Sequence, residues 1–100
     1  MNNFSLDQIE PNKFVISGSI TFESGSDIAA IGKDNFKGLK TVELDFSKIT
    51  TIDSAILAVL LDWRRFFQAN NIDFVFLGAK HNLKVLLKSY GLADLFVFYD

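Results

Sequence analysis

Residues 41–70 constrain the fold most, because their apolar residues change from an alternating pattern to a helical one. Within residues 41–47, Val42, Leu44 and Phe46 alternate with polar residues, which is typical of a strand with one solvent-facing side. Within residues 54–70 the apolar side chains fall on one helical stripe, and we predict the strongest helix there. The members of this stripe are Ile56, Val59, Leu60, Trp63, Phe66 and Phe67. A strand followed directly by such a helix predicts a β-α-β unit with parallel strands.

The rest of the chain predicts further strands and helices around this unit. Strands are expected at residues 4–9, 13–22, 72–77 and 96–99, and helices at residues 24–39 and 81–90. In the second strand, the alternation places Phe22 on the same apolar side as Phe14 and Ile16. Pro11 separates the first two strands, which we therefore expect to form a hairpin. The sequence thus predicts an α/β fold with a small mixed β-sheet and helices packed mainly on one face.

Composition excludes several classes of function. The 100 residues suffice for one domain, so residues 1–100 are expected to form a single unit. A net charge of -2 argues against direct binding to nucleic acid or to an anionic membrane. The chain has no cysteine, His81 as its one histidine and no glycine-rich phosphate loop, so neither a metal ion nor a cofactor is expected. The longest apolar run, residues 55–61, is far shorter than the roughly 20 residues of a membrane-spanning helix, and the simplest expectation is a cytoplasmic protein.

The segment before the strongest helix, residues 47–54, is expected to be a loop and is rich in hydroxyl groups. It ends with Asp53 and Ser54 at the expected start of the helix. The N–H groups and the partial positive charge of a helix start favour anions, so Ser54 could carry a phosphate or meet an anionic group of a partner. Serine and aspartate are also the preferred caps of helices, and composition alone favours simple capping.

The sequence from Val42 to Ala58 resembles the signature of STAS domains. In that signature a strand ends in aspartate, an apolar residue and serine, as in Asp45-Phe46-Ser47, and an aspartate followed by serine or threonine then opens a helix, as in Asp53-Ser54. The resemblance continues through residues 74–78 and 90–92 and so covers nearly the whole chain. It implies a STAS-like fold, a small mixed sheet with helices on one side, and a regulatory binding module without catalytic activity or cofactor.

The resemblance points to two branches of the family. Residues 57–61 are similar to an apolar stretch of Mla-type subunits, which implies binding to the ATPase subunit of a phospholipid-transporting ABC complex with its permease. The chain would then be cytoplasmic and held at the inner membrane through this partner, where the complex supports outer-membrane lipid asymmetry. In the alternative branch, the anti-sigma-factor antagonists, a serine kinase phosphorylates the residue that matches Ser54, and the phosphate abolishes binding to the anti-sigma factor. The family usually has glycine where this chain has Ile56, and this bulky residue is expected to alter the approach of a partner.

The expected contact surface lies on the strongest helix and at its start. Its residues are Asp53, Ser54, Leu57, Leu61, Arg64 and Arg65, with Ser54 at the centre and Asp53 holding the loop. Leu57 and Leu61 lie beside the main apolar stripe, next to the arginines, and an apolar strip rimmed by charge is typical of contact surfaces. The alternative is a wide core stripe that buries both leucines.

The residues argue against two other functions. Asp45 ends a strand as the phosphoacceptor of a receiver domain would, but such a site needs several carboxylates around magnesium, and only Glu10 ends the first strand. A hydrolase built from Ser54, His81 and Asp53 lacks the glycine-flanked turn of a nucleophilic serine. The many aromatic residues could stack on nucleic acid or surround an acyl chain, but their spacing indicates a packed core.

Overall fold

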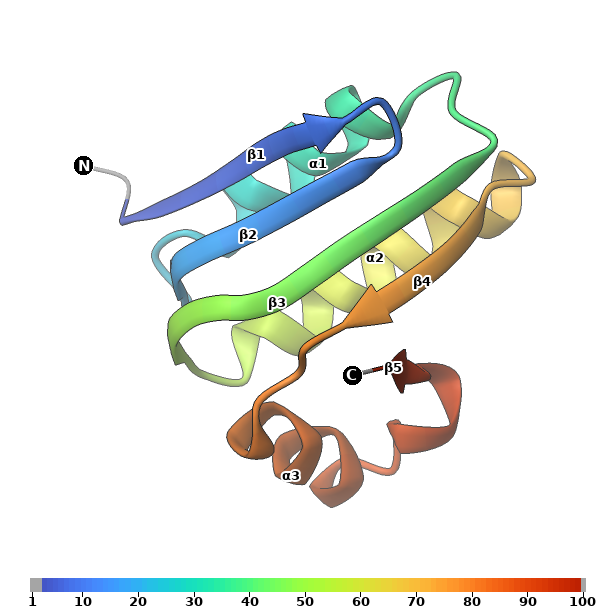
Figure 1. The fold of residues 1–100 in the computed structure, drawn as a ribbon. Coiled ribbons are helices and arrows are strands. Elements are labelled where there is room, and N and C mark those ends of the chain that lie inside the picture. Colours follow the sequence, from blue (N-terminus) through green and yellow to red (C-terminus); the bar gives the residue numbers. More distant parts are fainter. Residues whose placement is uncertain (1–2, 100) are drawn as a thin grey trace.

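The computed structural model describes residues 3–99, which form a 5-stranded sheet with its strands in the order β1-β2-β3-β4-β5 (Figure 1). The elements, in chain order, are β1 (Phe4–Glu10), β2 (Lys13–Ile20), α1 (Gly25–Phe36), β3 (Thr41–Ile52), α2 (Ala55–Ala69), β4 (Asp73–Leu77), α3 (His81–Ser89), the short helix η1 (Ala93–Leu95) and β5 (Phe98–Tyr99). Strand β1 is antiparallel to β2, and every other neighbouring pair is parallel. The predicted hairpin and the predicted mixed α/β sheet are both confirmed.

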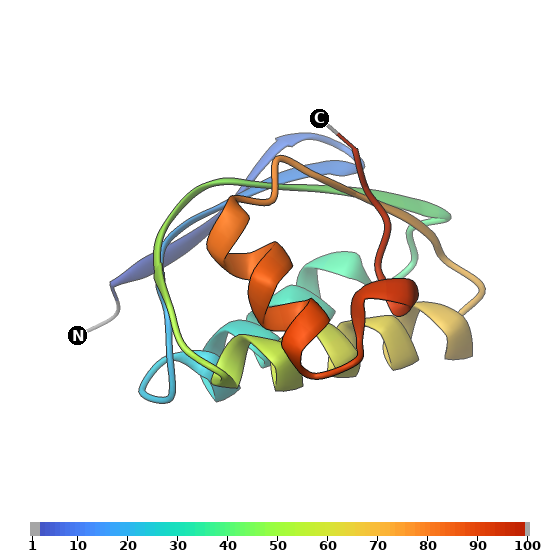
Figure 2. The same ribbon diagram turned by 90° about the horizontal axis from the view of Figure 1, so that it is seen from below.

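All three helices lie on the same side of the sheet (Figure 2). Helices α1 and α2 follow the parallel strands β2 and β3, so both begin at the same edge of the sheet. A single buried layer then forms between the sheet and these helices, as expected when one face of a sheet is apolar. The prediction that the helices pack mainly on one face is confirmed.

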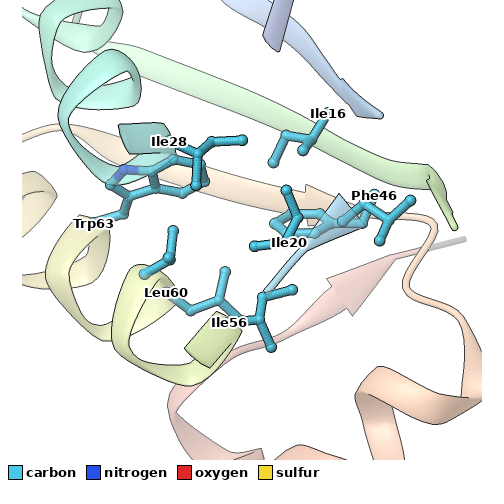
Figure 3. Close-up of a pocket in the computed structure, with 9 residues that line it drawn as sticks. Ile16, Ile20, Ile28, Phe46, Ile56, Leu60 and Trp63 are labelled. Atoms are coloured by element: carbon cyan, nitrogen blue, oxygen red, sulfur yellow. The ribbon is translucent and has the colours of Figure 1, made fainter. Parts of the chain in front are cut away.

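The core between α1, α2 and the sheet is closed. Figure 3 shows side chains from α1, α2, β2 and β3 pointing toward one another: Ile28, Ile56, Leu60, Trp63, Ile16, Ile20 and Phe46. They leave about 0 Å³ for a water-sized molecule. The ring of Trp63 lies on Gly32, where an added Cβ would come within 2.5 Å of the indole, and its Nε1–H donates to the carbonyl oxygen of Ala29 over 3.0 Å. Glycine at position 32 therefore lets the two helices approach closely.

The prediction that β3 ends at residue 47 is wrong. The strand continues to Ile52, because Lys48, Ile49, Thr51 and Ile52 also pair with β2. Two shifts of register interrupt this pairing, so the apolar alternation breaks while the strand goes on. Only Asp53 and Ser54 separate β3 from α2, and the short connection fixes both residues between two rigid elements.

The prediction that Phe22 points into the core is also wrong. Strand β2 ends at Ile20, and the Phe22 side chain is 87% exposed. The hydroxyl of Ser24 closes a turn after the strand: it accepts the N–H of Thr21 over 3.0 Å and donates to the carbonyl oxygen of Ser19 over 2.9 Å. This turn directs the chain into α1 before the alternation reaches Phe22.

Candidate functional site

The candidate site is the connection between β3 and α2. Ser54 is exposed and already has helical backbone angles, with φ -63° and ψ -15°. Within residues 3–99 its hydroxyl makes no hydrogen bond, so Ser54 does not cap the helix through its side chain. The hydroxyl is available to a partner or to a modifying enzyme.

Asp53 caps the helix and also holds a second loop. Its Oδ1 accepts the N–H of Ala55 over 2.8 Å, and its Oδ2 accepts the N–H of Phe22 over 3.0 Å. The carboxylate therefore joins the start of α2 to the turn that leads into α1. The structure agrees here with the expectation that Asp53 holds the loop.

The first N–H groups of α2 are already used. Ala55 donates to the Asp53 side chain, Ile56 donates to the carbonyl oxygen of Asp53 over 3.1 Å, and Leu57 donates to that of Ser54 over 3.1 Å. The expectation that this helix start offers unpaired N–H groups to an anion therefore fails for Ala55, Ile56 and Leu57. A phosphate on Ser54 would instead lie beside the carboxylate of Asp53, where like charges repel.

The prediction that Leu57 is a contact residue is wrong. Its side chain is 6% exposed and belongs to the continuous apolar core, because the buried stripe of α2 is wide enough to include it. Leu61 is half-buried and packs against the same core. Ile56 is 1% exposed, so it fills the core and does not obstruct a partner at the helix start, contrary to the expectation from the family glycine.

The two predicted arginines differ in their surroundings. Arg64 is half-buried and reaches Gln68 of its own helix, with 3.5 Å between Nη1 and Oε1. Arg65 is exposed and lines an open hollow of about 650 Å³ between α1 and α2. The hollow is lined by Phe22, Gly25, Ser26, Ala29, Ala30, Lys33, Ala55, Ala58, Val59, Asp62 and Arg65. It begins at Ala55, directly after Ser54, and Lys33 and Asp62 are joined beside it by an ion pair of 2.7 Å.

The sequence pattern indicates neither the exposure of Phe22 nor the hollow. The usable signal was Ser24-Gly25, since serine and glycine favour a turn and could have ended β2 before Phe22. The hollow itself is formed by small side chains on two helices, and only their packing brings these residues together.

The residues of the rejected functions do not assemble into sites. His81 is exposed at the start of α3, and in the described part of the chain it shares no hydrogen bond with Ser54. The Oδ1 of Asp45 accepts the N–H of Ser47 over 2.8 Å. Among residues 3–99, no group of three His, Asp or Glu side chains could hold a metal ion, and no helix is long and apolar enough to cross a membrane.

Comparison with solved structures finds the same fold in anti-sigma factor antagonists. The anti-sigma factor antagonist SpoIIAA in its unphosphorylated form is 17% identical, with a TM-score of 0.75 over 97% of this chain and 88% of that chain. The phosphorylated form of SpoIIAA, the Bacillus cell fate determinant, is 20% identical, with a TM-score of 0.69 over 97% of this chain and 91% of the other. An anti-sigma factor antagonist from Mycobacterium paratuberculosis is 16% identical, with a TM-score of 0.72 over 96% and 83% of the two chains. No curated protein matches the sequence.

The mixed sheet and the helices on one face define a small α/β domain that shares its fold with SpoIIAA. The sequence model of the STAS domain matches residues 5–100. The chain belongs to the STAS domain family, as its sequence signature indicated.

Proposed function

We propose that this chain is a non-catalytic regulatory module that binds another protein at the start of α2 and is switched at Ser54. The observation that carries the proposal is the exposed Ser54 hydroxyl, which has no hydrogen bond in the described part of the chain and yet lies on a rigid connection. A group held in place without a structural partner is suited to contact or modification. A cytoplasmic location is part of the proposal.

The partner that the comparisons support best is an anti-sigma factor or its serine kinase. SpoIIAA, which shares the fold, is known in phosphorylated and unphosphorylated forms. Ile56 points into the core, so the difference from the family glycine leaves the surface around Ser54 open. Phosphorylation of Ser54 would add up to about two negative charges beside Asp53, where the N–H groups of Ala55, Ile56 and Leu57 already donate within the chain. The added charge would weaken binding to a partner that fits the unmodified surface.

The second candidate is the ATPase of an Mla-type phospholipid-transporting ABC complex, and the hollow beside Ser54 favours it. Of the apolar stretch 57–61, Leu57 is buried, whereas Ala58 lines the hollow and Leu61 is half-buried. A segment of an ATPase could lie in the hollow, between Ser54 and Arg65, and hold the chain at the inner membrane through the complex. In this case Ser54 would be a contact residue without being modified.

The test is affinity purification of the tagged chain from detergent-solubilised native cells, followed by mass spectrometry. An anti-sigma factor or a serine kinase at stoichiometric amounts would establish the first candidate, and an ABC ATPase with its permease the second. Ser54→Glu should reduce recovery of the partner about tenfold or more, because the new carboxylate is larger than the hydroxyl, must be desolvated at a contact, and lies next to the carboxylate of Asp53. Ser54→Ala tests whether the hydroxyl itself is needed. Ser89→Glu, at an exposed serine of α3 whose hydroxyl donates to the carbonyl oxygen of Val85, is the control for added charge elsewhere on the surface. Equal recovery with Ser54→Glu and with wild type would refute the proposal.

A further inference from the structure

Phe22 is the most exposed of the large apolar residues in the described part of the chain, at 87%. Single exposed apolar side chains are common on proteins, so exposure alone carries no functional meaning. Two features separate Phe22 from the others: the rigidity of its turn and its place at the rim of the hollow.

The turn that carries Phe22 is held on both sides. The N–H of Phe22 donates to Oδ2 of Asp53 over 3.0 Å, and the N–H of Gly25 donates to the carbonyl oxygen of Thr21 over 2.8 Å. Ser24, which closes the turn, is buried at 8% exposure. The backbone under the ring therefore has little conformational freedom to lose on binding, which is the property of a preorganised anchor.

The hollow beside Phe22 is lined by several small residues, among them Gly25, Ala29, Ala55 and Ala58. On α1 it extends from Gly25 to Lys33, which corresponds to about 12 Å along the helix axis and to about two turns of another helix. A projecting ring and a hollow thus lie side by side on one surface, and both can be used by the same partner.

The charges around Phe22 indicate what kind of partner fits. Residues 21–32 include Glu23 and Asp27 but no lysine or arginine, and Asp53 lies against the same turn. These carboxylates repel anionic lipids and nucleic acids, whereas basic side chains of a protein would be attracted. At the far end of the hollow, Arg65 favours an acidic group, since Lys33 is already paired with Asp62.

We propose that Phe22 is the apolar anchor of the partner-binding surface. The ring inserts into an apolar pocket of the partner protein that is bordered by lysine or arginine, and a helix of that partner lies in the hollow with its acidic end toward Arg65. The inference rests on the proposed function, namely that the Ser54 surface binds a protein, and it adds the chemistry of that protein. Asp53 then has two roles, because its carboxylate holds both Phe22 and the first turn of α2.

The experiment uses the full chain in its native cells. Phe22→p-benzoylphenylalanine places a photocrosslinker at the rim of the hollow, and Ile9→p-benzoylphenylalanine, at a 60% exposed position on β1, is the matched control. Mass spectrometry of the adducts identifies the crosslinked peptide. In parallel, recovery of the partner is measured for Phe22→Ala, Phe22→Trp and Ile9→Ala, together with the melting temperature of each variant.

We expect position 22, but not position 9, to crosslink to another protein. The crosslinked peptide should be apolar and flanked by lysine or arginine. Phe22→Ala should lower recovery of the partner roughly tenfold or more with little change in melting temperature, and Phe22→Trp should retain most of it. An adduct with a second copy of this chain, with lipid or with nothing would overturn the inference. If Ser54→Glu abolishes partner recovery but Phe22→Ala does not, the anchor is wrong and the proposed function stands. If neither change lowers recovery of the partner, both the anchor and the proposed function are wrong.

Discussion

Two serines precede helices in this protein, and their hydroxyl groups have opposite surroundings. Ser24, before α1, is 8% exposed, accepts the N–H of Thr21 and donates to the carbonyl oxygen of Ser19. Ser54, before α2, is exposed, and no hydrogen bond of its hydroxyl is formed within residues 3–99. The same residue type at equivalent positions therefore stabilises the fold in one case and is left available in the other.

The difference arises because a different side chain accepts the backbone N–H groups at each helix start. At α1 the serine itself closes the turn, because no carboxylate there accepts the N–H of Thr21. At α2 the carboxylate of Asp53 accepts the N–H groups of Ala55 and Phe22, so the neighbouring serine is not needed for the turn. Where an aspartate directly before a serine accepts these N–H groups, the serine hydroxyl is not needed to hold the turn. Substitutions at both helix starts test this difference.

The largest effect is expected in the first turn of α2, below the exposed serine. Leu57→Ala should lower the free energy of unfolding by about 3 kcal/mol, because it leaves a cavity at a position that is 6% exposed. Leu61→Ala, at a half-buried position, should lower it by about 1 kcal/mol. Urea denaturation of both variants measures the difference. Equal losses would show that the start of α2 is not anchored in the core.

Ser24→Ala should lower the free energy of unfolding by about 2 kcal/mol. The change leaves the N–H of Thr21 and the carbonyl oxygen of Ser19 without the hydroxyl partner that they have in a largely buried turn. In a domain of this size such a loss corresponds to a fall in melting temperature of about 10 °C. Ser26→Ala, at an exposed serine in the first turn of α1, is the control and should stay within about 0.5 kcal/mol of wild type. A Ser24 variant as stable as the control would remove the distinction between the two serines.

The part of the molecule that could be predicted from the sequence is the part that follows from periodicity. The helical stripe of α2 and the alternation in β2 and β3 predict these three elements and their buried faces, and the structure confirms them apart from the ends of the strands. The short helix η1 was not predicted, and β5 is shorter than the predicted strand at residues 96–99. The errors lie where local geometry interrupts the period. The register shifts extended β3 to Ile52, and the Ser24 turn ended β2 before Phe22.

The candidate site could be predicted only in part. Asp53 and Ser54 could be predicted because they are adjacent in a recognisable sequence pattern, and residues that are adjacent in the chain are also close in space. The contact between Asp53 and Phe22 joins residues 31 positions apart, and no periodicity encodes it. The prediction for Leu57 is wrong because the spacing of apolar residues gives the direction of the buried stripe of a helix but not its width. The width depends on how many neighbouring elements pack against the helix.

Asp53→Ala should have an intermediate effect on stability. It removes the acceptor for the N–H of Ala55 at a helix start, a change that lowers stability by about 1 kcal/mol in other helices, and it also releases the N–H of Phe22. Asp53→Asn keeps one oxygen acceptor and should recover about half of this loss. Denaturation gives the stabilities, and amide hydrogen exchange at Phe22 reports the second bond directly. Unchanged exchange at Phe22 in Asp53→Ala would show that the carboxylate does not hold the turn.

Ser54→Ala should have the smallest effect, within about 0.5 kcal/mol of wild type, because the exposed hydroxyl has no hydrogen bond to lose in the described structure. Comparison with Ser24→Ala, which removes the same hydroxyl oxygen at the start of α1, shows whether only one of the two serines stabilises the fold. Urea denaturation of both variants, and of the double variant, separates the two positions: the losses should add, since the serines share no hydrogen-bond partner. A loss at Ser54 as large as at Ser24 would mean that its hydroxyl is structural. Modification of Ser54 would then weaken the fold, and the proposed switch would have to act by unfolding the first turn of α2.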